Sequence, residues 1–443
     1  MYKTKKKIGQ QSFFFTFEDT LNRNHPLFIL ANKVDWERFE KSFLGLYSQT
    51  TGAPAKPIRL MVGLLILKHI RNLSDESVVE QWSENAYYQY FCGEEEFCVS
   101  QPCDASELVH FRHRIGESGC ELIFKESIRI NGKDADDDEV IADTTVQEKN
   151  ITFPTDSKLH HKIIKKCHKI AEIEGIELRQ SYTRTIKKLS LNQRFRNHPK
   201  NKSKAKKADR KLKTIAGRLV RELQRKLPAQ NPYNLDLLLF HKVLSQIKND
   251  KNKIYSLHEP DVHCISKGKE HKKYEFGNKV SILLTKNTGV IVGALSFGNP
   301  YDGHTLDSVL IQHEQLTGKR AKNVWADRGY RGKTQIDATE VKIPKPLSNK
   351  ISRYRKEKEK KSFRRRAAIE PIIGHLKSDN RLNKNYYKGI QGDTVNVLLA
   401  TAAFNFKRMM NKWKHSFLSF FIDLLRRFLA DDRTFSKTFP LTA

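Results

Sequence analysis

The sequence predicts an α/β protein: a mixed sheet flanked by helices, with an all-helical N-terminal domain and a basic helical insertion. Apolar residues change from helical spacing in residues 57–92 to a short strand-like run at 138–148. Further strand-like runs at 273–286, 289–299 and 322–330 surround an amphipathic segment at 303–318. Mixed strands followed by helices that can pack on them are typical of an α/β sheet domain.

Composition indicates a polyanionic partner. The chain has 443 residues, of which 38% are hydrophobic, and it carries a formal net charge of +31. The hydrophobic share is enough to build cores, so wholesale disorder is excluded. A basic excess of this size favours a nucleic-acid partner over an anionic membrane, because each Lys or Arg placed on a phosphate releases counterions.

Residues 1–135 are predicted to form a helical domain. Ser74 is expected to cap one helix, and Asp104 with Glu107 has the form of a capping box at the start of another. Short helices joined by a tight turn suit a helix-turn-helix-like DNA-binding module. Arg112 and Arg114, with His113 between them, would then contact DNA; a plain helical bundle is the alternative.

The rest of the chain is predicted to hold a sheet domain at 136–410, with a helical insertion at 150–255. Within the insertion, the stretch "RNHPKNKSKAKKADRKLK" (196–213) has a single acid. A run in which nearly all charges are positive favours contact with a phosphate backbone over a merely solvated surface. Its candidate contacts are Lys204, Lys206, Lys207 and Arg210.

Two carboxylates are placed on or at the end of otherwise apolar strands. Asp143 lies inside "DEVIADTTVQE" (138–148), and Asp327 ends the strand in "KNVWADRGY" (322–330). A buried carboxylate is costly unless a cation neutralises it. If the two strands are neighbours in the sheet, the two carboxylates would converge.

A third acid stands in a cationic helix, "SFRRRAAIEPIIGHLKSD" (362–379). Arg366, Glu370 and Lys377 are spaced four and seven residues apart, which places them along one side of a helix. Pro371 suits only a first turn, so the helix is expected to begin near Ile369 after an entry turn.

Three carboxylates in one place would make a site for a hard cation. Mg²⁺, or Mn²⁺, prefers carboxylate, water and phosphate oxygens, and a pair of such ions can drive phosphodiester chemistry. Arg366 and Lys377 would hold phosphate. Ordinary surface ion pairs are the alternative for the same residues.

The three acidic motifs together resemble those of the DDE transposases of bacterial insertion sequences, most closely the insertion-sequence-five group. The motifs are "VIADTTVQEKN", "VWADRGYRGK" and "RRRAAIEPIIGHLKSD". The family's third motif is Tyr, Arg, Glu and Lys at fixed spacing; the last three match Arg366, Glu370 and Lys377, and Phe363 stands at the tyrosine position.

The resemblance implies a ribonuclease-H-like catalytic core in which Asp143, Asp327 and Glu370 bind two Mg²⁺ or Mn²⁺ ions. It implies cleavage at the element's ends, transfer of the freed 3′-OH into target double-stranded DNA, and action as a homodimer. Arg328, Arg364 and Arg365 adjoin the acidic motifs and are expected to contact DNA. The stretch "NPYDGHTL" (299–306) is also similar to the family, but Asp302 is interpreted as a turn residue.

The remaining sequence features concern alternative functions and the cellular location of the protein. A domesticated transposase that binds DNA without catalysis, or a plain nuclease, remains open as an alternative. No secretory signal or membrane span is visible, and the six cysteines are expected to be reduced in a cytoplasmic, nucleoid-associated protein. Cys98, Cys103, His110 and His113 form a weaker candidate metal cluster. Residues 411–443 are expected to form an amphipathic helix and tail.

Overall fold

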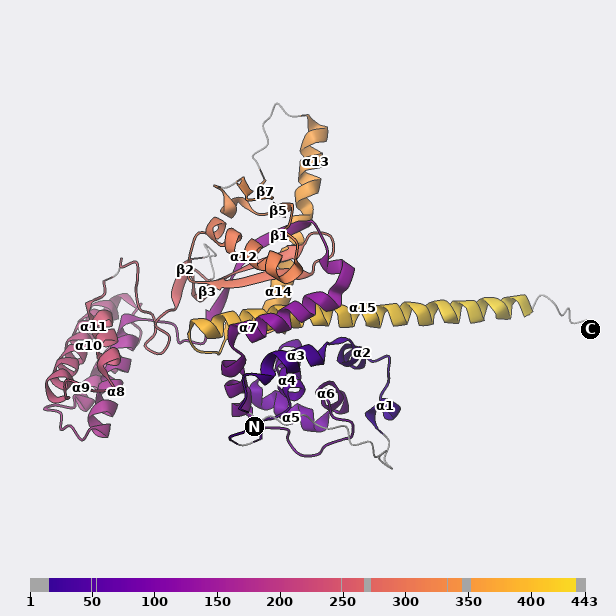
Figure 1. Ribbon diagram of the computed structural model, residues 1–443. Coiled ribbons are helices and arrows are strands. Elements are labelled where there is room, and N and C mark those ends of the chain that lie inside the picture. Colours follow the sequence, from indigo (N-terminus) through magenta and orange to yellow (C-terminus); the bar gives the residue numbers. More distant parts are fainter. Residues whose placement is uncertain are drawn as a thin grey trace, which may run out of the picture. The chain divides into compact units, whose positions relative to one another are not determined.

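The computed structural model describes residues 16–435, apart from residues 49, 53, 248, 267–271, 333 and 345–351 (Figure 1). The chain forms two compact units: Met1–Gln147 with Lys279–Ala443, and Glu148–Asn278. The start of the chain and the side chains of the helix expected at 416–430 lie outside the described residues, as does the tail from residue 436. No described helix has the length and apolar character needed to span a membrane.

The first unit is built around a mixed sheet whose central strands run in the order β4-β3-β1-β5-β7. Strand β1 pairs in parallel with β5, and β5 in parallel with β7, whereas β3 and β4 are antiparallel. The α/β prediction is confirmed. The bounds of these strands are β1 Glu139–Lys149, β3 Tyr274–Thr285, β4 Ile291–Phe297, β5 Asn323–Trp325 and β7 Thr339–Lys342.

Three short strands extend the sheet. Strand β2 (His263–Ser266) pairs with the first residues of β3, β6 (Gln335–Ile336) pairs with β7, and β8 (Lys384–Asn385) pairs with β1. The predicted hairpin is confirmed, since β3 and β4 meet at Asn287–Gly289, where Gly289 has a φ of 73°. A positive φ of this kind is cheap only for glycine, so the glycine fixes the turn.

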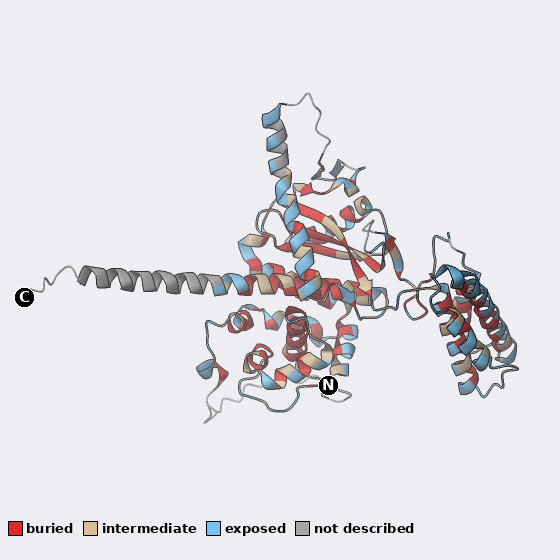
Figure 2. Cartoon of the chain, turned by 180° about the vertical axis from the view of Figure 1, so that it is seen from behind, coloured by how far each residue is buried: buried red, intermediate tan, exposed pale blue. Residues whose placement is uncertain are grey.

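Helices cover the sheet. Helix α12 (Asp302–Thr317) follows β4 and ends at Gly318, which has a left-handed φ of 75° as the sequence predicted. Helix α13 (Arg353–Arg364) and a short 3₁₀ turn, η3 (Arg365–Ala368), lead into α14 (Ile369–Asp379). The expected start of the Glu370 helix at Ile369, after an entry turn, is confirmed. Figure 2 shows the buried centre of the sheet and the exposed outer sides of α13 and α14.

The N-terminal region is helical in the described residues. Helices α4 (Ile58–Ile70) and α7 (Ala105–Asn131) pack with the start of the long helix α15 (Gly389–Phe435), and α5 (Asp75–Glu84) packs on α4 and α7. Four shorter helices complete it: α1 Phe17–Thr20, α2 Pro26–Lys33, α3 Trp36–Leu44 and α6 Ala86–Phe91.

Local capping follows the sequence closely. The Ser74 side chain accepts a hydrogen bond from the Ser77 amide, and Asp104 and Glu107 form the expected capping box. Helix α7 is longer than predicted because it continues through a kink at Gly116, where φ is 60° and ψ is −158°. Only glycine adopts that conformation readily, so the glycine allows two helical segments to join.

The second unit contains a helical bundle. Its helices are α8 Asp156–Ile173, α9 Thr183–Asn192, α10 Pro199–Lys226 and α11 Asn234–Ser245. Apolar residues of α10 such as Leu212, Leu219 and Leu223 are fully buried in a core shared with α8 and α11. The periodicity of these residues leaves the remaining sides of α10 to its many cations.

Candidate active site

Asp143 and Asp327 lie in one row of the sheet. The parallel β1–β5 ladder pairs Glu139 with Asn323 and Ile141 with Trp325, a constant offset of 184 (323 − 139). Continued for two more residues, the same offset places Asp143 opposite Asp327, just where β5 ends. Residues two apart on a strand point to the same face. The structure therefore brings together two of the predicted acids, about 180 positions apart in sequence.

Local hydrogen bonds orient both carboxylates. Asp327 caps a short 3₁₀ turn, η2 (Arg328–Tyr330), and its Oδ1 accepts a hydrogen bond from the Gly329 amide at 2.8 Å. The Oδ1 of Asp143 accepts from the Thr144 amide at 2.7 Å. Both side chains are half-buried, so each combines a fixed orientation with access from solvent.

Asp302, which was predicted to be a turn residue, contributes a third carboxylate beside Asp143 and Asp327. It is the first residue of α12, where its Oδ1 accepts a hydrogen bond from Thr144 Oγ1 at 3.0 Å. A Cβ built on Gly329 would lie 2.9 Å from Asp327 Oδ1 and 3.1 Å from Asp302 Oδ2, so the two carboxylates flank one glycine. Lys279 Nζ lies 2.8 Å from Asp302 Oδ1 and neutralises it.

Tyr330 closes the buried side of this cluster. Its side chain is 2% exposed. Burial raises the pKa of Tyr330 well above its ordinary value, and the charges of Asp143, Asp302 and Asp327 raise it further. The phenol therefore stays protonated beside these carboxylates.

Helix α14, which carries Glu370, packs on the same face of the sheet. The preceding residue, Ile369, is fully buried in a small cluster with Ile141 and Trp325. Those two residues point to the same face as Asp143 and Asp327, two positions further along their strands. The Glu370 side chain itself is 68% exposed, and Arg366 Nη2 lies 4.0 Å from its Oε1.

The described side chains nevertheless include no group of three Asp, Glu, His or Cys residues close enough to hold a metal ion. The cluster predicted from Cys98, Cys103, His110 and His113 is therefore not a metal site in the described structure. Carboxylates such as those of Asp143, Asp302 and Asp327 suit Mg²⁺ or Mn²⁺ and do not suit softer metals. Glu370 is positioned by its helix on the same face.

Predicted cationic residues near the site fall into two kinds. Arg328 and Arg364 are exposed, and Lys377 lies half-buried in the last turn of α14. Arg365 has its guanidinium tied to the β3–β4 turn, with Nε donating to the Lys286 carbonyl at 3.0 Å and Nη2 donating to Asn287. Arg365 therefore fastens the entry of α14 to the sheet in addition to being exposed.

Arg112 requires a correction. Its side chain is 8% exposed, and its two terminal nitrogens bind the Asp75 carboxylate at 2.7 and 2.8 Å. Lys68, 2% exposed, binds the same carboxylate at 2.8 Å. Arg112 thus joins α7 to α5 in a buried ion cluster and is not a surface contact for DNA. Arg114 is exposed and lies over the Tyr47 ring at 4.3 Å.

The second unit presents the predicted cations outward. Lys204, Lys206, Lys207 and Arg210 are all exposed on α10. Arg210, Lys213 and Arg221 also line a cavity of about 580 Å³ between α10 and α11, whose described lining includes His241 and no acid. A groove lined by one sign of charge concentrates an anionic partner.

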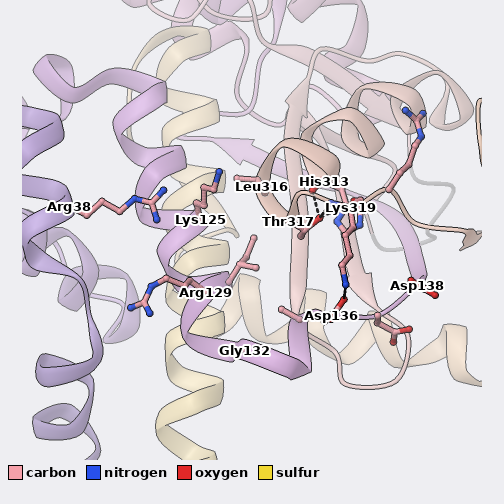
Figure 3. A pocket seen from close by; sticks show the side chains of 14 residues that line it. Arg38, Lys125, Arg129, Gly132, Asp136, Asp138, His313, Leu316, Thr317 and Lys319 are labelled. Atoms are coloured by element: carbon pink, nitrogen blue, oxygen red, sulfur yellow. Dashed lines mark hydrogen bonds and ion pairs between the residues drawn. The ribbon is translucent and has the colours of Figure 1, made fainter.

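A separate cavity of about 360 Å³ lies where β1 begins, between α7 and α12 (Figure 3). Lys125 and Arg129 of α7 face it on one side, and Lys319 binds Asp136 at 2.6 Å on the other. Its acids precede β1, at the far end of the strand from Lys149. The cavity is therefore distinct from the carboxylate cluster.

Two family models match the chain. Residues 15–114 match "Transposase domain (DUF772)", and residues 247–406 match "Transposase DDE domain". The second match contains Asp302, Asp327 and Glu370, and it implies the ribonuclease-H-like core that the strand order displays. Asp143 lies between the two matched regions.

One curated relative is 44% identical over 179 residues, which are 39% of this chain and 86% of the relative. It is an uncharacterized protein, ORF8 in the nfe locus, of Rhizobium meliloti. No solved structure matches the chain at a significant level. Transposases with this DDE domain act on DNA and use divalent metal ions. From the two family models and this relative, the chain belongs to the DDE transposases of bacterial insertion sequences, within the insertion-sequence-four/five superfamily.

Proposed function

We propose that the protein cleaves phosphodiester bonds at the ends of its element and transfers the freed 3′-OH into target DNA. The observation that carries this proposal is the position of Asp143 and Asp327 in one row of adjacent parallel strands, with the Glu370 helix packed on the same face. In this reading Asp143, Asp327 and Glu370 are the catalytic acids, and a homodimer handles two DNA ends together.

The acids would hold two Mg²⁺ or Mn²⁺ ions, whose chemistry is to activate the attacking oxygen and stabilise the leaving oxygen. The chain's own groups supply the rest. Thr144, Gly329 and Lys279 orient the carboxylates through the contacts described above. Arg366 stands beside Glu370, where a guanidinium can bind a phosphate in two-point fashion. Lys377, two turns further along α14, offers a second positive charge.

Substitution of each acid tests the proposal. Asp143→Asn, Asp327→Asn and Glu370→Gln should each abolish cleavage of a plasmid that carries the element's ends, while DNA binding changes little. Removing an activating carboxylate leaves the protein's phosphate contacts intact but not its chemistry. Glu340→Gln is a matched control, because Glu340 is an exposed acid on β7 away from the cluster.

A non-catalytic DNA-binding protein is the second candidate. It is favoured by one observation, the 68% exposure of Glu370, which leaves that carboxylate outside the converged group. The two candidates separate in one assay. A wild-type chain that binds the ends but leaves them uncut, with Mg²⁺ and with Mn²⁺, supports the second. Cleavage that survives any one of the three acid substitutions contradicts the assignment of those acids.

A further inference from the structure

One cavity of the first unit is lined by none of the carboxylates of the candidate active site and has no role in the proposed chemistry. Its volume is about 700 Å³, within the range of small-ligand pockets. It is bordered by α5 and α7 on one side and by the loop that joins α14 to α15 on the other. The loop and the first residues of α15 have the sequence "RLNKNYYKGIQGD" (381–393), in which aromatic residues stand among basic ones.

Tyr386 stands at the mouth of this cavity with its ring available. The residue is 58% exposed, which is unusual for a large aromatic side chain. Two cations border the ring: Arg381 Cζ lies 5.6 Å and Lys384 Nζ 5.9 Å from its centroid. Lys388 lines the same cavity. An exposed ring among cations is the arrangement that binds unstacked bases and their phosphates.

Arg381 lines the cavity, and its backbone is held in an unfavourable conformation. Its φ is 67°, in the left-handed region that non-glycine residues rarely adopt. The side-chain amide of Asn396 donates to the Arg381 carbonyl at 3.1 Å, and the neighbouring Leu382 is fully buried. Strain maintained in this way is concentrated at binding and catalytic sites.

The floor of the cavity is rigid. Arg112 Cζ lies 4.4 Å and Lys68 Nζ 4.8 Å from the centroid of the Tyr387 ring, and both cations are bound by Asp75. A Cβ at Gly392 would lie 2.8 Å from Tyr387 Cβ, so only glycine permits this packing. Because these contacts fix Tyr387, the loop holds the exposed neighbour Tyr386 in a defined position.

We propose that this cavity binds an unpaired nucleotide of the bound DNA, with Tyr386 stacking on the base and Arg381 and Lys388 contacting its phosphates. The inference rests on the proposed function, because it presumes DNA at the Glu370 end of α14. Asp379, the last residue of α14, is nine residues after Glu370, so the loop that lines the cavity begins about 14 Å along the helix from Glu370. This is the length of about four base-pair steps of duplex, within reach of a DNA end.

The test uses the full-length protein without added metal, so that cleavage plays no part. Two probes are compared: a blunt duplex, and the same duplex with a short unpaired extension that carries 2-aminopurine. The wild type should bind the extended duplex more tightly and change the 2-aminopurine fluorescence. Tyr386→Ala should weaken binding of the extended duplex by about 5- to 100-fold, the range for losing one base–aromatic stack.

Matched variants keep the result interpretable. Tyr386→Phe retains the ring and should bind like the wild type. Ile390→Ala removes a nearby side chain that is 61% exposed and should change neither probe. Equal binding of both probes by the wild type, or an unchanged preference in Tyr386→Ala, overturns the inference. Failure to bind the blunt duplex at all would instead overturn the proposed function.

Discussion

Asp302 places a further carboxylate beside the two strand acids, and Lys279 neutralises it. The Lys279–Asp302 pair is 2.8 Å long, and Lys279 Nζ also donates to the Pro300 carbonyl at 2.6 Å. An ammonium group that balances clustered carboxylates can yield its place to a divalent cation, because both satisfy the same negative charge. Asp302 is thus either a direct ligand or a group that orients Asp143 through Thr144.

Asp302→Asn should weaken binding of Mg²⁺ or Mn²⁺ by about 10- to 100-fold, the usual cost of losing a group that supports metal ligands. Calorimetric titration of the purified protein with either ion measures this without relying on activity. Asp307→Asn serves as the control. Asp307 lies on the same helix and has no described contact with Asp143 or Asp327. Unaltered affinity in Asp302→Asn, alongside a loss in Asp143→Asn, would restrict Asp302 to a structural role.

At the scale of elements, helix α4 is buried on almost every side, and this determines the protonation of His69. The His69 side chain is 0% exposed, and its Nδ1 donates to the Leu65 carbonyl at 3.0 Å. Burial, together with the nearby charge of Lys68, lowers the pKa of His69 to about 3. The imidazole is therefore neutral in the folded protein across the physiological range.

This burial predicts acid sensitivity. Between about pH 6.5 and pH 3 the unfolded chain binds a proton at His69 that the folded chain does not. The free energy of unfolding should therefore fall as pH falls through this window, by up to about 1.4 kcal/mol per pH unit. Urea titrations should show a shallower pH slope for His69→Asn, and a wild-type slope for His110→Asn, whose residue is exposed. Equal slopes in His69→Asn and the wild type would contradict the prediction.

The elements themselves follow from local sequence signals. Strand β1, the β3–β4 hairpin, the Ser74 cap and the start of α14 at Ile369 each depend on residues within a few positions, and each was predictable. The partners of Asp302 and Arg112 could not be predicted because they are remote in sequence: Thr144 lies 158 positions from Asp302, and Asp75 lies 37 from Arg112. Such pairings depend on the tertiary fold, which periodicity does not encode. Asp143 and Asp327 were the exception, since strands of like burial in one sheet are limited in how they can pair.

At the scale of the whole molecule, the charge excess is distributed unevenly between paired and unpaired cations. Many lysines of the first unit are matched with acids: Lys41 lies 2.7 Å from Glu37, Lys319 2.6 Å from Asp136 and Lys322 2.5 Å from Asp138. By contrast, Lys204, Lys206 and Lys207, exposed on α10 of the second unit, have no ion pair with a described acid. Unpaired cations are the ones that keep counterions to release on binding a phosphate backbone.

The α10 lysines should therefore dominate the salt dependence of DNA binding. Replacing Lys204, Lys206 and Lys207 with Gln should reduce the slope of log K against log salt by about 2–3, because each lost phosphate contact removes about 0.9. The matched control replaces Lys41, Lys319 and Lys322 with Gln. It removes the same charge from lysines that already have acid partners, so net charge alone cannot explain a difference between the two variants. Binding to a duplex, measured by fluorescence anisotropy over a range of salt concentrations, gives both slopes. If the two triple variants lose the same slope, DNA responds to the overall charge of the chain, and α10 has no special contact with the backbone.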